Sequence, residues 1–199
     1  MMNHDAPLER GRKRLLRIAP RQRHRLQWRR LRIPTALAGL FGCAVVGLQG
    51  AGLMYNATPS EPTGFYWLRS IPAAGVKPSD RVSFCPPVRQ ADYPFLAHGS
   101  CPGGTTPFFK TVVGVPGDVV VVTPTRVMVN GRVLPGSASL QRSVRLGVRL
   151  PHADGIWRLG AGQYWLYGAA LPQYSFDSRY WGVLQGSEMI GVARQLSVF

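Results

Sequence analysis

The sequence predicts a mainly β fold, with its strands in a closed or nearly closed sheet, behind a single N-terminal transmembrane helix. Three observations predict it. Residues 33–55 are apolar and uncharged, and no later segment shows sustained helical periodicity. The chain after residue 55 alternates short β-branched and aromatic runs with turns rich in Pro and Gly. With 199 residues, the chain can form one domain with a hydrophobic core.

The chain starts with a basic tail, residues 1–32. This tail holds eleven of the 24 Lys and Arg residues and only two acids, Asp5 and Glu9, in a chain of net charge +15. A basic tail can bind nucleic acid, contact anionic lipid or set the orientation of a membrane protein. Because an uncharged segment follows, we expect membrane lipid as a partner and no nucleic acid.

Residues 33–55 follow with the sequence IPTALAGLFGCAVVGLQGAGLMY. At about 1.5 Å per residue, this segment would reach roughly 35 Å as a helix, which exceeds the ~30 Å hydrocarbon core of a bilayer. A cleaved signal peptide has a shorter apolar region and rarely has a basic region of this length. The segment is therefore expected to be an uncleaved transmembrane signal-anchor.

The charges on either side of this segment predict its orientation. Eleven basic residues precede it, whereas residues 56–62 contain Glu61 and no Lys or Arg. The more basic flank of a membrane span is usually cytoplasmic. We therefore expect a single-pass protein of the bacterial inner membrane, with a cytoplasmic N-terminus and residues 56–199 as a periplasmic domain.

Cysteine usage fits an oxidising compartment. Cys85 and Cys101 bracket a loop that contains Pro and Gly, whereas Cys43 lies in the apolar segment and is expected to pack there. A disulfide that closes about 15 residues stabilises a fold by roughly 3 kcal/mol. We predict a Cys85–Cys101 disulfide and no metal site, because two cysteines and His98 lack the spacing of zinc ligands.

Short strands are expected throughout the outer domain. They are predicted at residues 65–69, 80–84, 108–115, 119–122, 126–130, 132–135, 163–168 and 189–198. Pro116-Gly117-Asp118 predicts a turn, and Asn130-Gly131 predicts a tight hairpin. Residues 136–155 show the least pattern and are expected to form a mobile loop.

Ser60 lies between two prolines in the segment TPSEPTG. Prolines on both sides restrict the backbone, and such rigid placement suits a nucleophile. Taken alone, the segment is more typical of a turn that ends the preceding helix.

Lys110 stands alone in the apolar run FFKTVVGV, in a chain with three lysines and 21 arginines. Burial disfavours the charged ammonium and lowers the pKa of a lysine, so a buried lysine can act as a general base near neutral pH. The alternative is a lysine whose aliphatic stem packs while its ammonium group reaches solvent.

A third polar segment, YSFDSRYWG, places polar side chains among aromatic ones. They are Ser175, Asp177, Ser178 and Arg179. A surface turn with an exposed ion pair, worth ~0–1 kcal/mol, would also explain this segment. Together, a serine, a lone lysine and a polar support cluster predict nucleophilic catalysis of the Ser-Lys type. A histidine triad would need His98 or His152, and both lie in turn-rich segments.

These motifs resemble those of the bacterial type I signal peptidases, and most closely those of their conjugal-transfer relatives, the TraF-type peptidases. TPSEPTGFY is similar to the TraF-type nucleophile box, Ser-x-Pro-x-Gly-x-Tyr, FKTVVGVPGD to the lysine box, and SFDSRYWG to the last box of the family. In leader peptidases the serine stands three residues before the proline, a position that is Pro59 here. The match covers roughly residues 33–199. It departs at residues 168–171, which read GAAL where general signal peptidases have Gly-Asp-Asn-Arg.

The resemblance implies a signal-peptidase-like β domain and a role for each matched residue. Ser60 would be the nucleophile and Lys110 its general base. The backbone N–H of Ser60 and the hydroxyl of Thr58 would bind the oxyanion. The supporting residues would be Ser175, hydrogen-bonded to the lysine, and the ion pair of Asp177 and Arg179.

The sequence therefore predicts a membrane-anchored serine endopeptidase that needs no cofactor. Its expected substrate is a propilin or related exported protein of a conjugative transfer system, which it would cleave or, as the resemblance to TraF-type enzymes implies, cyclise. One alternative is a general type I signal peptidase that removes signal peptides from preproteins. A second is a non-enzymatic bitopic assembly protein of a secretion apparatus, which would have no use for both Ser60 and Lys110.

Overall fold

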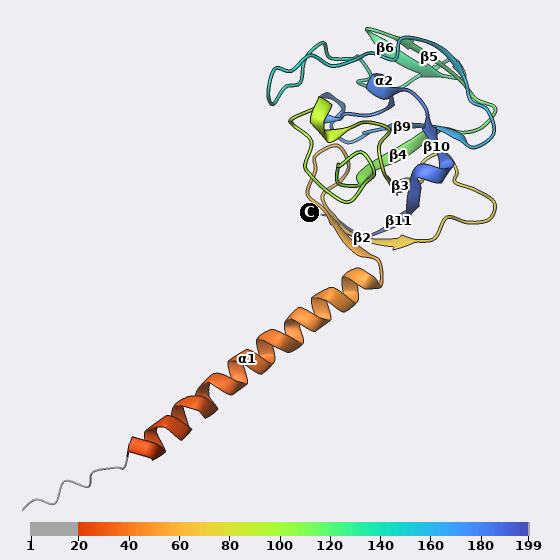
Figure 1. Cartoon of the computed structure of the whole chain (residues 1–199). Coiled ribbons are helices and arrows are strands. Elements are labelled where there is room, and N and C mark those ends of the chain that lie inside the picture. The colour runs from red at the N-terminus through yellow and green to blue at the C-terminus, as the bar shows by residue number, and fades with distance from the viewer. Residues whose placement is uncertain (1–19, 199) are drawn as a thin grey trace, which may run out of the picture. The chain divides into compact units, whose positions relative to one another are not determined.

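The structure, a computed structural model, describes residues 20–198, and within that range the side chains of residues 33–47 and 50–197 (Figure 1). Residues 1–19 of the predicted basic tail lie outside the described residues. The chain divides into two compact units, with the boundary between Gly47 and Leu48. The first contains most of helix α1, and the second is a β domain that holds every strand in the described residues.

Helix α1 runs from Pro20 to Gly50, so it begins inside the predicted tail and ends before residue 55. Its early start is consistent with the many Arg and Leu residues between 20 and 32, which favour helix. It ends close to Gly52, whose φ of 97° suits a glycine after a helix. In the described part of the chain no helix, the predicted span at 33–55 included, is both long and apolar enough to cross a membrane.

Two antiparallel sheets form the β domain. The first has seven strands in the order β1-β2-β11-β3-β4-β9-β10. Their bounds are β1 Leu53–Asn56, β2 Gly64–Arg69, β3 Arg81–Phe84, β4 Phe108–Gly114, β9 Gln163–Tyr167, β10 Leu184–Gln185 and β11 Met189–Val198. The second has four strands in the order β7-β6-β5-β8, with bounds β5 Val119–Thr123, β6 Arg126–Val129, β7 Arg132–Val133 and β8 Gly155–Arg158. In Figure 1, β5 and β6 lie together at the end of the β domain away from β2.

The mainly β prediction is confirmed, but the prediction of a closed or nearly closed sheet is not. The described strands form two open sheets, and β1 and β10 are the free edges of the larger one. The chain leaves the larger sheet after β4 at the predicted turn, where Gly117 has a φ of 95°. Because β5 then pairs with β6 and β8 rather than with β4, the strands divide between two sheets.

Two clusters of buried side chains form most of the core. The first consists of Val76, Val82, Phe84, Val112, Leu166, Leu184 and Met189. The second consists of Val120, Val122, Val127, Ala153, Leu159 and Trp165. Strand β9 contributes Leu166 to one cluster and Trp165 to the other, as expected from the alternation of side chains along a strand. Strands β4 and β9, which pair with one another, are therefore held firmly at the centre of the domain.

Candidate active site

Ser60 and Lys110, 50 residues apart in the sequence, meet in the β domain. Ser60 lies in the loop between β1 and β2, and Lys110 lies in the middle of β4. The Lys110 ammonium donates a hydrogen bond of 2.7 Å to the Ser60 hydroxyl. Ser60 is 2% exposed and Lys110 is 6% exposed, so the contact is shielded from water.

The Lys110 amine is less basic than an ordinary lysine. Burial lowers the pKa of Lys110 from 10.5 to about 8, because desolvation disfavours the ammonium. The negative charges of Asp177 and Glu61 oppose this shift, and the positive charge of Arg179 adds to it. A second hydrogen bond, 3.1 Å to the Phe109 carbonyl, fixes the amine in place. A lysine with this pKa is uncharged in a useful fraction of molecules near neutral pH and can accept a proton from a hydroxyl.

Asn56, the last residue of β1, organises the loop that carries Ser60. Its amide nitrogen donates to the carbonyl oxygens of Thr58, Glu61 and Pro62 at 3.0, 3.0 and 3.1 Å. Its amide oxygen accepts from the backbone N–H of Thr58 at 3.1 Å. One buried side chain thus fixes both ends of the loop around Ser60. The sequence gives no signal for this role, because nothing local marks an Asn that bonds to the backbone of later residues.

Thr58, the expected second oxyanion donor, is exposed and close to the serine. Its hydroxyl donates to the Asn56 amide oxygen at 2.7 Å and lies 3.4 Å from the Ser60 hydroxyl. To donate to a substrate oxyanion, this hydroxyl would have to rotate away from Asn56.

Glu61 follows the serine and is 1% exposed. Its carboxylate accepts from the Thr111 hydroxyl at 2.9 and 3.0 Å and from the Arg81 guanidinium at 3.1 Å. Two neighbouring residues of the β1–β2 loop are therefore bonded to two neighbouring residues of β4, Ser60 to Lys110 and Glu61 to Thr111. Glu61 is a positioning residue that sequence reasoning missed, and its only sequence signal is an acid between Ser60 and Pro62.

Glu61→Gln should move the pH dependence of activity toward lower pH. The Glu61 carboxylate holds the pKa of Lys110 up, so a neutral amide lets that pKa fall further. The amide oxygen can still accept from Thr111. The measurement is kcat/KM for a cleaved peptide between pH 6 and 10. Glu188→Gln is the matched control because Glu188 lies at a different cavity, and an unchanged midpoint in Glu61→Gln would contradict this role.

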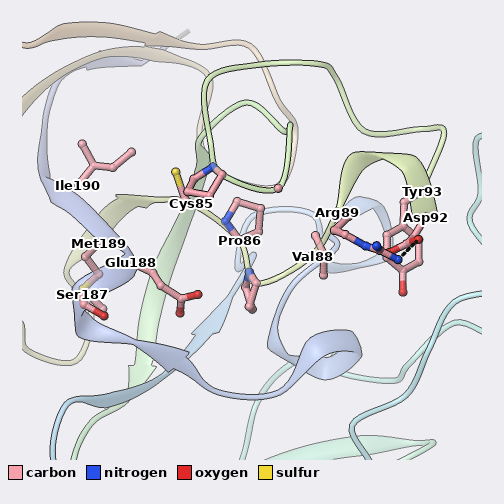
Figure 2. A pocket seen from close by; sticks show the side chains of 13 residues that line it. Cys85, Pro86, Val88, Arg89, Asp92, Tyr93, Ser187, Glu188, Met189 and Ile190 are labelled. Carbon is pink, nitrogen blue, oxygen red and sulfur yellow. Dashed lines mark hydrogen bonds and ion pairs between the residues drawn. The ribbon is translucent and has the colours of Figure 1, made fainter.

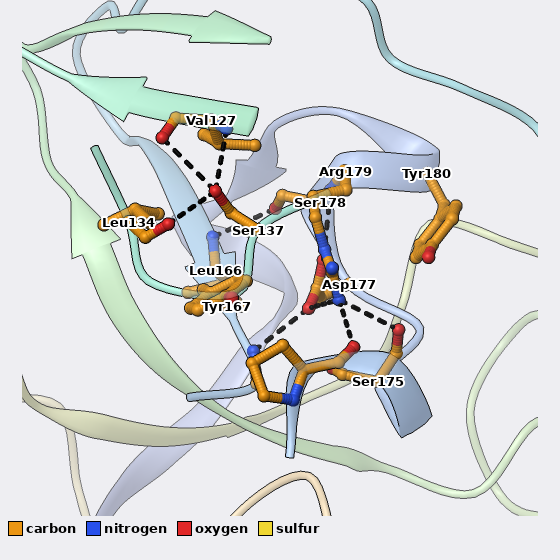
Figure 3. A network of polar contacts seen from close by, with 12 residues as sticks. Val127, Leu134, Ser137, Leu166, Tyr167, Ser175, Asp177, Ser178, Arg179 and Tyr180 are labelled. Atoms are coloured by element: carbon orange, nitrogen blue, oxygen red, sulfur yellow. Dashed lines mark hydrogen bonds and ion pairs between the residues drawn. The ribbon is translucent and has the colours of Figure 1, made fainter. Parts of the chain in front are cut away.

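A buried ion pair holds the segment YSFDSRYWG, residues 174–182 (Figure 3). Arg179 donates to Asp177 at 2.8 Å, and both side chains are fully buried. Asp177 also accepts from the Gly168 backbone N–H at 3.0 Å, and Arg179 donates to the carbonyl oxygens of Ala138 and Pro172 at 2.9 and 2.6 Å. The pair therefore fastens the segment to the end of β9 and to the chain near residue 138, which excludes an exposed surface turn.

Ser175, expected to hydrogen-bond Lys110, does not do so. Its hydroxyl is buried and has no hydrogen-bond partner among the described residues. Lys110 instead donates to Ser60 and to the Phe109 carbonyl. Ser175 packs against Gly168, where an added Cβ would collide with the Ser175 hydroxyl and come within 3.1 Å of the Ser60 Cβ. Gly168 therefore leaves space for Ser175 to lie beside Ser60. The sequence around Gly168 does not reveal this role.

A cleft of about 750 Å³ opens onto Ser60 and Lys110. Residues far apart in sequence line it, among them Phe95, Leu96 and Phe176. Its volume lies within the range of ligand pockets, roughly 300–1,000 Å³. Neither His98 nor His152 is among the lining residues, so the histidine triad finds no support.

A disulfide closes the loop that forms one wall of this cleft. Cys85 and Cys101 are joined, with their Cα atoms 5.4 Å apart. The enclosed loop carries Phe95 and Leu96 to the cleft, and the Phe95 ring lies 5.4 Å from that of Phe176. A second cavity of about 720 Å³ lies beside the disulfide, lined by Pro86, Arg89, Asp92, Glu188 and others (Figure 2). Ser60 and Lys110 do not line it.

Comparisons with known proteins show which family the chain belongs to. Residues 25–198 match the model of the family described as signal peptidase, peptidase S26. The plasmid transfer protein TraF of Escherichia coli is 33% identical over 172 residues, which cover 80% of this chain and 93% of that protein. The conjugal transfer protein TraF of Agrobacterium fabrum is 31% identical over 166 residues, which cover 80% of this chain and 90% of that protein.

A crystal structure of a signal peptidase I from Enterococcus faecalis also matches, with 22% identity and a TM-score of 0.36. The alignment covers 62% of this chain and 98% of the Enterococcus faecalis chain. The family match spans nearly all of the β domain, and the two TraF proteins align with most of their own length. The chain therefore belongs to the signal peptidase family, peptidase S26, and within it to the TraF-type peptidases of conjugal transfer.

Proposed function

We propose that this chain is a serine endopeptidase in which Ser60 is the nucleophile and Lys110 is the general base. The observation that carries the proposal is the buried 2.7 Å contact between the Lys110 amine and the Ser60 hydroxyl. A scaffold protein gains nothing from burying a lysine, because desolvation of an ammonium costs stability. The same burial provides a base for a hydroxyl that has no histidine beside it.

In the first step the neutral Lys110 amine takes the Ser60 proton while the serine oxygen bonds to the carbonyl carbon of the scissile peptide. The carbonyl oxygen becomes an oxyanion, which the Ser60 N–H and the rotated Thr58 hydroxyl would bind. One such donor contributes roughly 3 kcal/mol in acyl transfer. The carbon–nitrogen bond then breaks, and Lys110 returns its proton to the leaving amine. An ester between Ser60 and the substrate remains.

In the second step a nucleophile attacks the ester. Lys110 takes a proton from water or from a peptide amine, the new bond forms at the carbonyl carbon, and the serine oxygen leaves and recovers the proton. Water gives hydrolysis, whereas a peptide amine gives a new peptide bond and, within one chain, a cyclic product. The proposed substrate is a propilin or related exported protein of a conjugative transfer system, because relatives that the chain matches are named as plasmid and conjugal transfer proteins.

We also propose that the β domain acts at the outer face of the bacterial inner membrane. This part of the proposal rests on the sequence, in which a basic tail precedes an uncharged apolar segment. Protease added to spheroplasts should digest the β domain and leave a protected N-terminal fragment. Digestion only after the cells are lysed would contradict the proposed location.

Ser60→Ala should abolish substrate maturation while the protein stays folded. Pilin is isolated from conjugating cells that carry the wild type or the variant, and its mass is measured. A mass that equals the sum of the residues, without one water, indicates a cyclic product, and a shortened chain that retains the water indicates hydrolysis. A mature pilin in the variant would overturn the proposal, and removal of signal peptides from many unrelated preproteins would favour a general signal peptidase.

A further inference from the structure

Arg145 lines the same cleft as Ser60 and Lys110, and no Asp or Glu is among the lining residues. The two acids whose charges act on Lys110, Glu61 and Asp177, are buried and form ion pairs with Arg81 and Arg179. The cleft therefore presents positive charge to a bound chain, without an acid of its own to neutralise it.

Arg145 lies on a basic loop, residues 141–149, with the sequence QRSVRLGVR. The loop contains no acid, and its own backbone holds its shape. Ser143 N–H donates to the Val148 carbonyl and Gly147 N–H to the Ser143 carbonyl, both at 2.8 Å. The Arg142 guanidinium donates to the Gly147 carbonyl at 2.8 Å. Arg145 itself is exposed and has no hydrogen bond or ion pair among the described residues.

The loop is also fastened to the rest of the site. The Leu140 N–H donates to the Tyr180 hydroxyl at 3.1 Å, and Leu150 is 6% exposed. Leu140, Leu150 and Tyr180 line the cleft together with Arg145. Because the loop that carries Arg145 is held in shape beside the cleft, binding a substrate there costs less conformational freedom than binding by an arginine on an open coil. The planar fork of donors of a guanidinium matches a carboxylate in a bidentate contact.

We propose that Arg145 is a specificity-determining residue that binds the carboxylate of an Asp or Glu side chain in the substrate segment that occupies the cleft. This inference rests on the proposed function, because it takes the cleft to be the site of the substrate. It adds the chemical class of the segment, which carries an acidic residue at the place where it passes Arg145. An acidic side chain there would pair with Arg145 and leave the Ser60–Lys110 contact free.

The test measures binding, so it does not depend on catalysis. Full-length Ser60→Ala protein in a neutral detergent is titrated with fluorescent, Ala-rich peptides that are acetylated and amidated and so have no terminal charge. Each peptide carries Glu, Gln or Lys at one of ten successive positions. At one or two positions the Glu peptide should bind about 5-fold more tightly than the Gln peptide, and the preference should weaken in 0.5 M NaCl.

Adding Arg145→Gln should remove the Glu preference, and adding Arg145→Glu should reverse it toward the Lys peptide. Arg149→Gln is the matched control, because Arg149 lies on the same loop but does not line the cleft, and it should keep the preference. Equal binding of Glu and Gln peptides at every position, or a preference that survives Arg145→Gln, would overturn the inference. Cleavage by the wild type with no Glu preference would leave the proposed function intact.

Anionic lipid is the other ligand that could pair with this guanidinium. Vesicles of phosphatidylcholine with and without phosphatidylglycerol are therefore compared in the same assay. Arg145-dependent binding to phosphatidylglycerol vesicles, without a Glu preference among the peptides, would also overturn the inference and make Arg145 a lipid contact.

Discussion

Lys110→Met should lower peptide cleavage by about 1,000- to 10,000-fold and leave the protein at least as stable as the wild type. The loss is expected because methionine fills the space of the lysine stem but cannot take the proton of Ser60. Activity of the wild type should rise with pH through about 8, as the Lys110 ammonium gives up its proton. The measurements are kcat/KM against pH and urea unfolding of both proteins.

The expected stability of the Lys110→Met protein follows from the same pKa. The pKa of Lys110 is about 8 in the folded protein and 10.5 in a free lysine, so the unfolded chain binds the proton more tightly. Below pH 8 this difference costs the folded state about 3 kcal/mol, and the cost disappears as the pH rises toward 10.5. Lys110→Met removes the cost, so its free energy of unfolding near pH 7 should match or exceed that of the wild type.

Lys77→Met is the matched control, because Lys77 is exposed on a turn outside the cleft. It should change neither activity nor stability by a measurable amount. A Lys110→Met protein that keeps its activity would refute the role of Lys110 as the base. One that loses both activity and stability would show that the lysine supports the fold instead.

Much of the β domain follows from local sequence, because its strands carry strong signals. The strands predicted at 65–69, 108–115 and 189–198 match β2, β4 and β11 closely. The Asn130-Gly131 hairpin is confirmed, and both residues have positive φ. Strand β1 is not among the predicted strands, because residues 53–55 end the apolar segment that is predicted to span the membrane. Division into two sheets could not be predicted, since it depends on which strands pair across the turn after β4.

Some residues of the candidate site could likewise be predicted from the sequence, and others could not. Ser60 and Lys110 could be selected because each is chemically unusual for its surroundings, a hydroxyl between prolines and a lone lysine in an apolar strand. Asn56, Glu61 and Gly168 could not, because their roles come from contacts made only in the folded chain. The Glu61 carboxylate, for example, meets Thr111, which lies 50 residues away. The expected Ser175 hydrogen bond fails for the same reason, since packing against Gly168 decides where that hydroxyl lies.

Asp177→Asn should destabilise the β domain by about 3–5 kcal/mol, although Asp177 does not touch a reacting atom. The change leaves the Arg179 guanidinium fully buried with no negative partner. It also weakens the contact with the Gly168 N–H that fastens this segment to the end of β9. Urea unfolding of the full chain gives the measurement. Asp92→Asn is the control, because the Arg89–Asp92 pair is exposed and should contribute no more than about 1 kcal/mol.

A double variant that removes both charges separates the stability cost of an unpaired buried charge from the contribution of the hydrogen bonds around it. In the double variant Asp177→Asn with Arg179→Met, no buried charge is left unpaired, so part of the lost stability should return. Recovery will be incomplete, because Arg179 also donates to the Ala138 and Pro172 carbonyls. A double variant that is less stable than Asp177→Asn alone would mean that these carbonyl contacts outweigh the charge. A loss of less than 1 kcal/mol in Asp177→Asn would show that the pair does not hold residues 174–182 in place.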